Sequence, residues 1–426
     1  MPNDHLALKT NHSSFSGHEI WILSEFGKPI FSSCGRENEL CSTFALIQVF
    51  VKRYETWKDS LCSIQTSSIY VQFLYRSPLI LCIISKHPYN LNVQLDIVYN
   101  QVISILSKSM LKSIYGKMGD NFDLRRYLDG VEKRIDSCVK GFNEDPVIFL
   151  TGFRILLLDA ADREFIVQTM AKAINQYSPN NVVFAMFVAH RQLAAIVRMH
   201  RLNLSASDFN MIVNTIECHS SLRDGETWVP ICLPQFDQNS FLHAHISYLW
   251  EGTGPCLIFL SISKDAFFDL AKVRSKIESE LDAYKRCARL KEALSHPDAF
   301  STKQIANPEL WHFMYKNTLT SQVCCSSPQK PYIAYDELLS LYHSAYFRLT
   351  NLLRRTKNSP KMFFMQRDEY ALFTWVTTSF ELYCTFSPLV TQTTVVKAAE
   401  SVLRVLRDNE KRVFFNIAPG LLTENS

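Results

Sequence analysis

The hydrophobic pattern near the start of the chain predicts a strand pair followed by a long helix. Residues 20–24 are apolar at almost every position, which is typical of a strand buried on both faces of a sheet. A short loop containing glycine and proline then leads into a second strand at Ile30. Apolar residues recur at helical spacing over residues 39–57, and Asn38 is placed to cap the first turn. We therefore expect a hairpin that feeds a helix lying across the same sheet.

Three short strands and two more helices are predicted in the rest of the first third of the chain. The strands are separated by serine-rich and proline-containing turns. The predicted strands cover residues 61–66, 69–76 and 79–85, and the predicted helices cover about 95–106 and 123–139.

The last third of the chain repeats this plan. A predicted helix over residues 335–355 is followed by three strands and a final helix. The strands cover residues 362–366, 371–377 and 380–386, and the final helix covers 394–406. The equal spacing at the two ends of the chain indicates two copies of one fold.

The middle of the chain is less regular and fits one further unit of the same kind. Its helices are predicted over residues 161–177, 206–218 and 264–294, the last broken once, and its strands over 182–189, 192–199, 228–233, 241–250 and 256–262. We expect Trp228 and Phe241 to belong to its core. Residues 297–308 are predicted to be a linker and residues 321–331 an exposed loop.

Composition limits the function more than it reveals it. A chain of 426 residues with 47% hydrophobic and 20% charged residues is an ordinary globular protein of about three domains. A net charge of +4 over this length does not indicate a nucleic-acid-binding protein. The 12 cysteines are scattered in apolar patterns, which favours reduced core thiols in a cytosolic protein. Apolar runs are too short to span a bilayer, so any membrane contact is expected to be peripheral.

Motifs for catalysis or metal binding are absent from the sequence. No phosphate-binding glycine loop, nucleophile elbow, zinc-protease motif or C-x-x-C pair occurs. His243 and His245 lie two apart on a predicted strand, so their side chains point the same way. They could contribute to a zinc site with a third ligand, or they could be packed strand residues, and the second interpretation is favoured. The sequence predicts neither an enzyme nor a cofactor.

A run of basic residues precedes the third predicted strand group. Six basic and no acidic residues lie between positions 348 and 367. Such a run is usually a solvated helix face, but it also suits an anionic lipid surface, where each cation adds about 1 kcal/mol. The candidate lipid-facing residues are Arg354, Arg355, Lys357 and Lys361.

Several segments of the sequence together resemble one family, the monensin-sensitivity (Mon, or SAND) family of vacuolar-fusion proteins. The similarity runs in order along nearly the whole chain, from about residue 18 to 418. It is carried by residues 22–30 (ILSEFGKPI), 76–79 (RSPL), 123–126 (DLRR), 225–234 (GETWVPICLP), 241–249 (FLHAHISYL) and 381–389 (ELYCTFSPL).

This resemblance implies an α+β fold of three longin-like (profilin-like) domains in series, each an antiparallel sheet flanked by helices. The expected domains cover residues 18–142, 143–296 and 297–426, after a disordered tail over 1–17. Family members usually carry a long polar, acidic N-terminal extension, and by this resemblance we expect it to be reduced here to about 17 residues.

The resemblance also implies a function without covalent chemistry. The chain is expected to be one subunit of a heterodimeric guanine-nucleotide exchange factor, whose partner is a Ccz-type longin protein. Its expected substrate is the Rab GTPase of late endosomes and vacuoles. Its expected place is the cytoplasm, with peripheral recruitment to endosomal, lysosomal or vacuolar membranes that display anionic lipids or phosphoinositides. Endosome maturation, vacuole fusion and autophagy would depend on it.

The exchange surface of such a complex is expected to combine the first longin domains of both subunits. The candidate GTPase-facing residues are Thr43, Gln48 and Lys52, on the side of the first helix expected to be exposed. Ordinary solvent exposure is the alternative for these three residues. At the level of the whole protein, the alternative is a longin scaffold, tether or coat adaptor that binds a GTPase without exchange, since both functions use the same fold.

Overall fold

The computed structural model describes residues 18–415 apart from short internal segments. The predicted tail over residues 1–17 lies outside the described part, as do the C-terminal residues after 415. The internal segments that are not described are 36–38, 89, 119–122, 129–130, 178–180, 200–201, 220–224, 251–253, 298–299, 306, 333, 335, 344 and 346–360.

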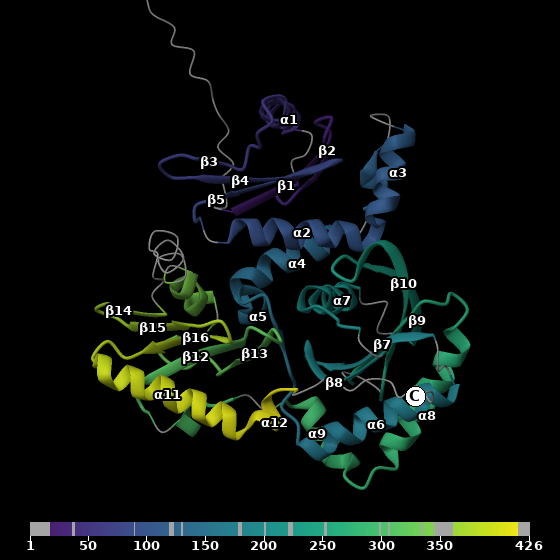
Figure 1. Ribbon diagram of the computed structural model, residues 1–426, viewed down its shortest axis with the longest axis vertical. Coiled ribbons are helices and arrows are strands. Elements are labelled where there is room, and N and C mark those ends of the chain that lie inside the picture. The colour runs from purple at the N-terminus through teal and green to yellow at the C-terminus, as the bar shows by residue number, and fades with distance from the viewer. Residues whose placement is uncertain are drawn as a thin grey trace, which may run out of the picture. The chain divides into compact units, whose positions relative to one another are not determined.

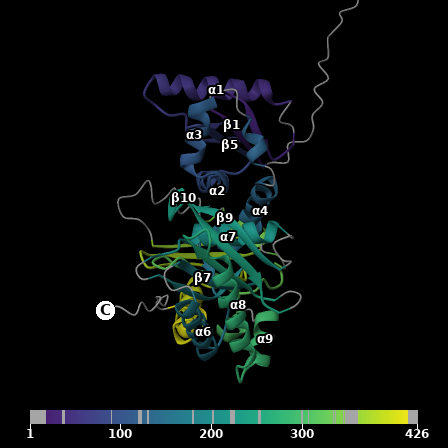
Figure 2. The same cartoon turned by 90° about the vertical axis from the view of Figure 1, so that its right-hand side faces the viewer.

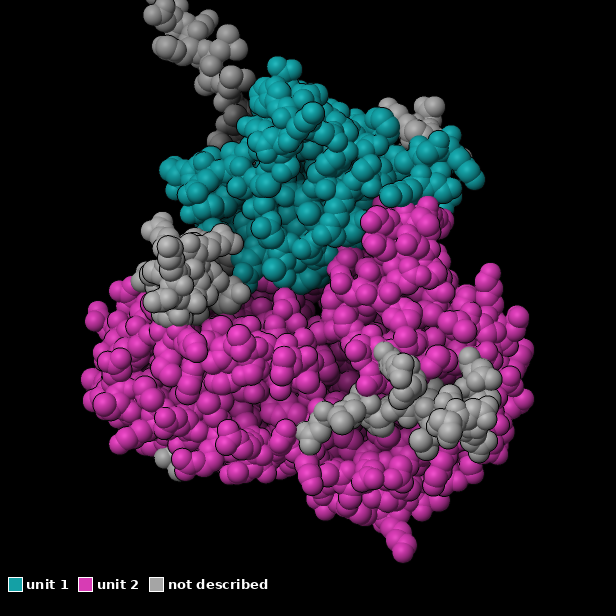
Figure 3. Space-filling view, in the orientation of Figure 1, with its two compact units in different colours: residues 1–99, 112–132 teal, residues 100–111, 133–426 magenta. Residues whose placement is uncertain are grey.

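The chain divides into two compact units, shown in different colours in Figure 3. The first unit contains residues 1–99 and 112–132, and the second unit contains residues 100–111 and 133–426. The described residues form three mainly antiparallel sheets, one in the first unit and two in the second. Each unit is described separately below.

The first unit is built on a five-stranded antiparallel sheet in the order β2-β1-β5-β4-β3. Its two central members, β1 and β5, are buried along almost their whole length, as the doubly apolar pattern of residues 20–24 predicts. The strands are β1 (His18–Ser24), β2 (Pro29–Ser32), β3 (Ser63–Gln65), β4 (Tyr70–Arg76) and β5 (Leu79–Ser85).

Helix α1 (Cys41–Thr56) lies between β2 and β3 in the chain, which confirms the helix predicted over residues 39–57. Phe44, Ile47 and Val51 are its buried residues, and they join the core formed by the sheet. The predicted cap is wrong, because the helix begins after Leu40 without a side-chain hydrogen bond. Asn38 itself lies outside the described residues.

The segment that follows the first sheet contains more helices than predicted. They are α2 (Leu91–Leu106), α3 (Lys108–Met118), the 3₁₀ turn η2 (Leu124–Tyr127) and α4 (Val131–Glu144). The prediction of a single helix over residues 123–139 is therefore wrong. The Asp123 side chain accepts a hydrogen bond from the Arg125 amide and caps a short 3₁₀ turn, which ends at Leu128 before α4 begins.

The second sheet has the order β8-β7-β11-β10-β9 and lies in the second unit. Figures 1 and 2 show α7 on one side of this sheet and α6 and α8 on the other. The elements agree with those predicted for the middle of the chain. They are α6 (Ala160–Tyr177), β7 (Val182–Ala189), β8 (Gln192–Arg198), α7 (Ala206–Cys218), β9 (Glu226–Leu233), β10 (Asp237–Tyr248), β11 (Cys256–Ser261), α8 (Phe267–Asp282) and α9 (Cys287–Ser295).

The third sheet has six strands in the order β14-β15-β16-β12-β13-β6. Helix α11 packs on one face, and the helical residues 336–343 pack on the other. The elements of this domain are η4 (Thr302–Ile305), β12 (Leu310–Asn317), β13 (Gln322–Cys325), β14 (Met362–Gln366), β15 (Ala371–Val376), β16 (Phe380–Phe386), α11 (Gln392–Asp408) and α12 (Glu410–Val413).

The hairpin that opens the third domain was not predicted from the sequence. Residues 321–331 were expected to form an exposed loop, yet Gln322, Val323 and Cys324 are buried in strand β13. The strand has only four residues, but it lies between β12 and β6 and is therefore covered by its neighbours.

All three sheets share one strand order. In each, the second strand of the domain is at one edge, and the first, fifth, fourth and third strands follow. The third sheet adds β6 beyond this set. In each domain one helix lies between the second and third strands, namely α1, α7 and the helical residues 336–343. The repeat inferred from spacing at the two ends is therefore present three times.

A short connector joins the two domains of the second unit. It contains α5 (Pro146–Phe149) and β6 (Phe153–Arg154), and β6 pairs in parallel with β13 of the third sheet. Its next residue, Ile155, bridges to Leu193 of the second sheet. Gly152 has no space for a Cβ atom, which would lie 2.6 Å from the Ser321 carbonyl oxygen. The connector is thus held against both domains.

Arg163 on α6 stabilises the same joint from the other side. Its guanidinium donates hydrogen bonds to the carbonyl oxygens of Lys411 and Arg412 at the end of α12 and to that of Leu156. Burial lowers the pKa of Arg163 to about 10, so the guanidinium remains charged at neutral pH. A cation at a helix C-terminus also complements the helix dipole.

Candidate functional site

Helix α1 of the first unit has two apolar faces. One face is buried against the sheet through Phe44, Ile47 and Val51. The opposite face also carries large apolar side chains, at positions separated by three, four and seven residues, which places them on one side of the helix. We call them the outer stripe: Leu46, Val49, Phe50 and, at the end of the helix, Trp57.

The outer stripe is exposed to solvent. Val49 retains 57% of its accessible surface and Trp57 retains 59%, and the other two members are about half exposed. Arg53 lies over the Trp57 ring at 5.0 Å from its centroid. Isolated exposed apolar residues are normal, but a row of them on one helix face marks an interaction site. These residues were not predicted as functional, although their helical spacing is visible in the sequence.

Two of the three predicted GTPase-facing residues, Gln48 and Lys52, lie on one side of α1, which we call the polar flank. Thr43, Gln48 and Lys52 are half-buried rather than fully exposed, because the helix turns its apolar outer stripe to solvent instead. The expected exposure of these residues is therefore wrong in degree. Their role in GTPase binding stays a prediction.

Gln48 and Lys52 are tied to the loop between β1 and β2. Gln48 Nε2 donates to the Glu25 carbonyl oxygen at 3.3 Å, and Lys52 Nζ lies 3.0 Å from the Tyr75 hydroxyl and 3.9 Å from the Glu25 carboxylate. The same carboxylate accepts hydrogen bonds from Tyr75 and Ser77. Burial opposes the charge of Lys52, but its hydrogen bonds outweigh burial and raise its pKa.

Gly27 allows this loop to approach α1 closely. Its φ is +82°, and a Cβ atom there would lie 3.3 Å from Gln48 Cβ. The preceding residue, Phe26, is 47% exposed and stacks on Tyr115. A larger residue than glycine would strain the backbone and push the loop away from the polar flank.

The predicted lipid-facing residues fall mostly outside the described part of the chain. Arg354, Arg355 and Lys357 lie there. Lys361 is described and exposed, immediately before β14, and its carbonyl oxygen accepts a hydrogen bond from the Val376 amide. In the described part of the chain, no helix is long and apolar enough to cross a membrane.

His243 and His245 on β10 both face Trp228, as the strand spacing predicts. The His243 ring stacks on Trp228 at 5.5 Å, and the buried His245 lies 2.9 Å from the Glu226 carboxylate. Burial lowers the pKa of His245, although Glu226 opposes the shift. Trp228 and Phe241 are half-buried, so the prediction that they are core residues is wrong in degree. Trp228 lies on the edge strand β9 and packs against the rim of the core.

Within the described residues, no cluster of three or more histidine, cysteine or acidic side chains could hold a metal ion. All 12 cysteines are free thiols, and half of them are buried. Burial raises the pKa of Cys138 and of Cys256 to about 12, which makes these thiols unreactive. The buried thiols of Cys138 and Cys256 therefore offer no nucleophile.

Three longin domain models match the chain in sequence order. They are described as the first, second and third longin domains of FUZ, MON1 and HPS1, and they match residues 18–138, 180–278 and 309–410. The fold is thus three longin domains of the α+β class, as the resemblance implies.

Full-length relatives agree with this result. The chain is 34% identical to vacuolar fusion protein MON1 homolog A of Macaca fascicularis over 93% of its own length and 70% of that protein. It is 33% identical to the Homo sapiens protein of the same name, of which it covers 60%, and 30% identical to vacuolar fusion protein MON1 of Yarrowia lipolytica, of which it covers 73%.

Two solved structures match single portions of the chain. They are a Roadblock/LC7 domain from Streptomyces avermitilis, with a TM-score of 0.19 over 26% of this chain and 93% of that one, and Myxococcus xanthus MglB, with a TM-score of 0.20 over 27% and 86%. Identities of 13% and 12% add nothing to the assignment. With three longin domains in order and a third of its residues identical over almost its whole length, this chain belongs to the MON1 (SAND) family of vacuolar fusion proteins.

Proposed function

We propose that this chain is one subunit of a heterodimeric guanine-nucleotide exchange factor for the late-endosomal or vacuolar Rab GTPase. Its partner is a Ccz-type longin protein, and the complex promotes endosome maturation and vacuole fusion. The observation that carries the proposal is the outer stripe of α1, an apolar helix face that no described part of the first unit covers.

The outer stripe suits a permanent subunit partner better than a transient one. Obligate interfaces are more apolar than transient interfaces, which resemble the rest of the protein surface. Burying a whole side chain of this size contributes about 1.5–3 kcal/mol, so four half-exposed ones together contribute roughly 3–6 kcal/mol. We assign the outer stripe to a helix of the Ccz-type partner.

The polar flank beside the outer stripe suits the GTPase. Lys52, Gln48 and the Glu25 carboxylate offer charged and hydrogen-bonding groups that already hold a fixed arrangement. Exchange needs no nucleophile, because a GTPase retains its nucleotide through its own phosphate loop and Mg²⁺. A surface that binds the nucleotide-free form more tightly must weaken nucleotide binding by the same factor. A ten-thousandfold faster release requires about 5.5 kcal/mol of barrier lowering.

Membrane recruitment is part of the proposal. The basic residues Arg354, Arg355, Lys357 and Lys361 would bind an anionic or phosphoinositide-bearing surface of endosomes or vacuoles, and exposed Lys361 is available for such a contact. Neutralising all four should reduce liposome flotation at low salt, and by less as salt rises. Unchanged flotation would remove this part of the proposal and leave the exchange activity untouched.

Nucleotide-release kinetics test the proposal directly. The purified chain, a Ccz-type partner and the Rab loaded with a fluorescent guanine nucleotide are mixed, and release is followed after excess unlabelled nucleotide is added. We expect Phe50→Asp to abolish most of the acceleration, because a carboxylate cannot be buried in an apolar interface. Leu389→Asp is the matched control, since Leu389 is 85% exposed in the third domain.

Three results are informative. Acceleration that requires the partner and is lost only in Phe50→Asp supports the proposal. Binding of the Rab without faster release would identify a scaffold or adaptor instead. Full acceleration by the chain alone would contradict the requirement for a partner subunit.

A further inference from the structure

Arg53 places a positive charge among the apolar residues of the outer stripe. It follows Val49 by four residues and Phe50 by three, and it precedes Trp57 by four, so it lies on the same side of α1 as they do. Arg53 is exposed, and its guanidinium lies over the Trp57 ring, 5.0 Å from the centroid. Any subunit that covers the outer stripe must therefore also cover this cation.

In the described part of the chain, no carboxylate pairs with Arg53. Glu55 is the only acidic residue of α1, and its carboxylate accepts a hydrogen bond from Lys52 Nζ at 3.0 Å. Lys52 belongs to the polar flank, so Glu55 is held away from the outer stripe. The Arg53 guanidinium thus depends on solvent and on the Trp57 ring for its stabilisation.

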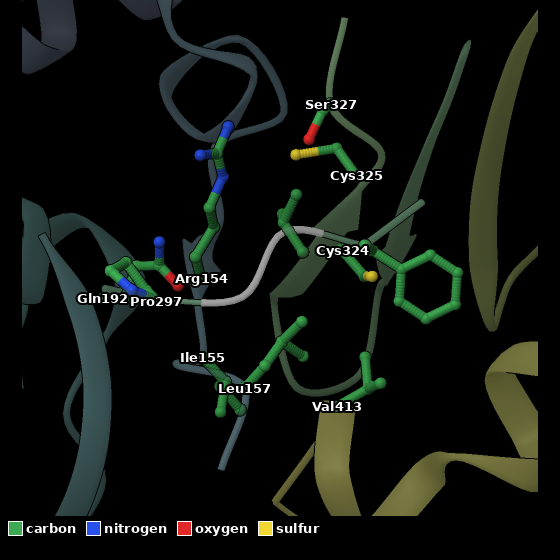
Figure 4. Close-up of a pocket in the computed structure, with 11 residues that line it drawn as sticks. Arg154, Ile155, Leu157, Gln192, Pro297, Cys324, Cys325, Ser327 and Val413 are labelled. Carbon is green, nitrogen blue, oxygen red and sulfur yellow. The ribbon is translucent and has the colours of Figure 1, made fainter. Parts of the chain in front are cut away.

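Arginines that the chain itself covers already have acceptors. Arg154 lines a cavity of about 110 Å³ in the second unit, shown in Figure 4, and its guanidinium lies 3.7 Å from the Asp145 carboxylate. Arg163, which is buried, donates to backbone carbonyl oxygens. A guanidinium that loses water without such an acceptor destabilises the state that buries it. Covering Arg53 therefore requires an acceptor that the described residues do not supply.

A carboxylate on the covering subunit is the acceptor that fits best. The Trp57 ring attracts a cation, but it offsets only part of the lost hydration. A guanidinium has five N–H donors, and a carboxylate accepts two of them side by side.

We propose that Arg53 selects the subunit that covers the first domain: the covering helix of the Ccz-type partner carries a carboxylate that pairs with Arg53 inside the outer stripe. This inference rests on the proposed function, because that function supplies the covering subunit. The apolar residues then contribute most of the buried area, and the ion pair fixes which helix binds and in which register.

The same charge disfavours a second copy of this chain as the cover. In a two-fold contact each α1 meets the identical surface of the other, so two arginines would be buried without a carboxylate between them. Asp59 follows the helix and could reach Arg53 of the second copy only if the two helices crossed near Thr56. That crossing would leave Leu46 at the other end of the stripe uncovered. Arg53 thus favours a different chain over self-association.

Calorimetric titration of charge variants with the Ccz-type partner tests the inference. Arg53→Glu should raise the Kd by about a hundredfold or more, because two carboxylates would then face each other. Arg53→Leu leaves the partner's carboxylate unpaired in an apolar interface and should raise the Kd by about tenfold or more. Lys58→Glu is the matched control, since Lys58 is an exposed cation just after the helix and outside the outer stripe. It should bind within about threefold of the unaltered chain.

Replacements on the partner identify the carboxylate. Each acidic residue of its covering helix is changed to lysine and titrated against Arg53→Glu. One replacement should restore binding to within about tenfold of the unaltered pair, while it weakens binding of the unaltered chain. A cation in the last turn also stabilises its own helix, but that role would lower the melting temperature of the variants and would not produce such a reciprocal rescue.

Sedimentation velocity of the chain without its partner tests the exclusion of a second copy. Arg53→Leu makes the outer stripe apolar throughout, so it should self-associate at a concentration about tenfold lower than the unaltered chain. Lys58→Leu is the control and should behave as the unaltered chain does. Self-association of Arg53→Leu that is no stronger than that of Lys58→Leu would contradict the exclusion.

Three binding results would overturn the selection by Arg53. They are a folded Arg53→Glu that binds the partner as tightly as Lys58→Glu does, an Arg53→Leu that binds more tightly than the unaltered chain, and no rescue by any lysine replacement. Phe50→Asp separates this failure from failure of the proposed function. If Phe50→Asp alone loses binding, the partner covers the outer stripe but Arg53 does not select it. If Phe50→Asp also binds normally, the partner does not cover the outer stripe at all.

Discussion

Helices α1 and α7 occupy the same place in the first and second longin domains, but only α7 is covered on both sides. Each follows the second strand of its domain and packs against the sheet. In α1 three residues are buried, whereas in α7 eight of 13 are buried. The difference lies on the outer face, the one turned away from the sheet.

The chain itself supplies the cover for α7. The Asn214 side chain donates to the Arg134 carbonyl oxygen of α4 at 3.0 Å, and Asn210 donates to the Gly152 carbonyl oxygen of the connector at 2.7 Å. Phe209 also contacts Phe153 of β6. Side chains on the outer face of α7 therefore donate hydrogen bonds to neighbouring backbone carbonyl oxygens. The outer stripe of α1 instead consists of apolar side chains that no described residue of the first unit covers. This contrast supports the proposal that a partner subunit covers the outer stripe of α1 in the first domain.

The largest expected effect is loss of packing under α7. Ile212 is 1% exposed in the core between α7 and the second sheet, so Ile212→Ala should reduce the free energy of unfolding by about 2–5 kcal/mol. Denaturant unfolding of the second unit measures it. A loss below about 1 kcal/mol would mean that α7 is less firmly packed than its burial indicates.

The buried carboxyl group of Asp208 at the start of α7 makes stability depend on pH. Burial raises the pKa of Asp208 from 3.8 to about 6. Hydrogen bonds from the Gln235 amide and with Ser205 lower it, but burial outweighs them. Because the folded-state pKa lies above the unfolded one, this group favours folding most below pH 4, and that contribution is lost as pH rises through about 6. The shift corresponds to about 3 kcal/mol.

Unfolding of Asp208→Asn between pH 4 and pH 7 measures this contribution. Asparagine keeps an acceptor oxygen but does not titrate, so the variant should gain stability relative to the unaltered chain as pH rises. Parallel pH profiles for the two proteins would contradict the assignment. Asp237→Asn is a control, because hydrogen bonds from Ser240 and Asn239 lower the pKa of Asp237 and reverse the sign.

The hydrogen bonds that cover α7 should contribute a smaller amount. Asn214→Ala leaves the Arg134 carbonyl oxygen without its side-chain donor in a buried site and should cost about 1–3 kcal/mol. Hydrogen exchange of the α4 amides provides a second measure, because α4 should open more readily in the variant. Unchanged exchange and stability would mean that α4 covers α7 through packing alone.

The smallest effect on stability is expected at the outer stripe. Leu46→Ala in the chain without its partner should change the free energy of unfolding by about 0.5 kcal/mol or less, since Leu46 is 53% exposed. The same variant should weaken binding of the Ccz-type partner by about tenfold or more. A stability loss of several kcal/mol would show that the chain itself buries this face.

The sequence predicted the helices and strands best where one pattern dominated. The spans of α7, β14 and β16 were predicted to the residue, because capping, turns and period agree there. The β12-β13 hairpin was missed, since β13 is short and its burial comes from long-range pairing with β6. The prediction of one helix over residues 123–139 was wrong because Asp123 stabilises a competing 3₁₀ turn.

The candidate site was predicted less well than the fold, for a physical reason. A helical stripe of apolar residues in a sequence indicates burial but not what buries it. Leu46, Val49 and Phe50 therefore look like core residues until the position of the sheet is known. The polar Thr43, Gln48 and Lys52 were assigned to the exposed side because polar residues usually lie there. The spacing does predict the buried face of α1 through Phe44, Ile47 and Val51, but the structure is needed to show that the second apolar face is exposed.

The central claim is that a Ccz-type partner covers the outer stripe of α1. Hydroxyl-radical footprinting of the chain alone and in the heterodimer, read by mass spectrometry, tests it most directly. We expect labelling of Leu46, Phe50 and Trp57 to fall at least fivefold in the heterodimer, while Leu389 of the third domain is labelled equally in both. Unchanged labelling of the outer stripe in a heterodimer that demonstrably forms would contradict the account.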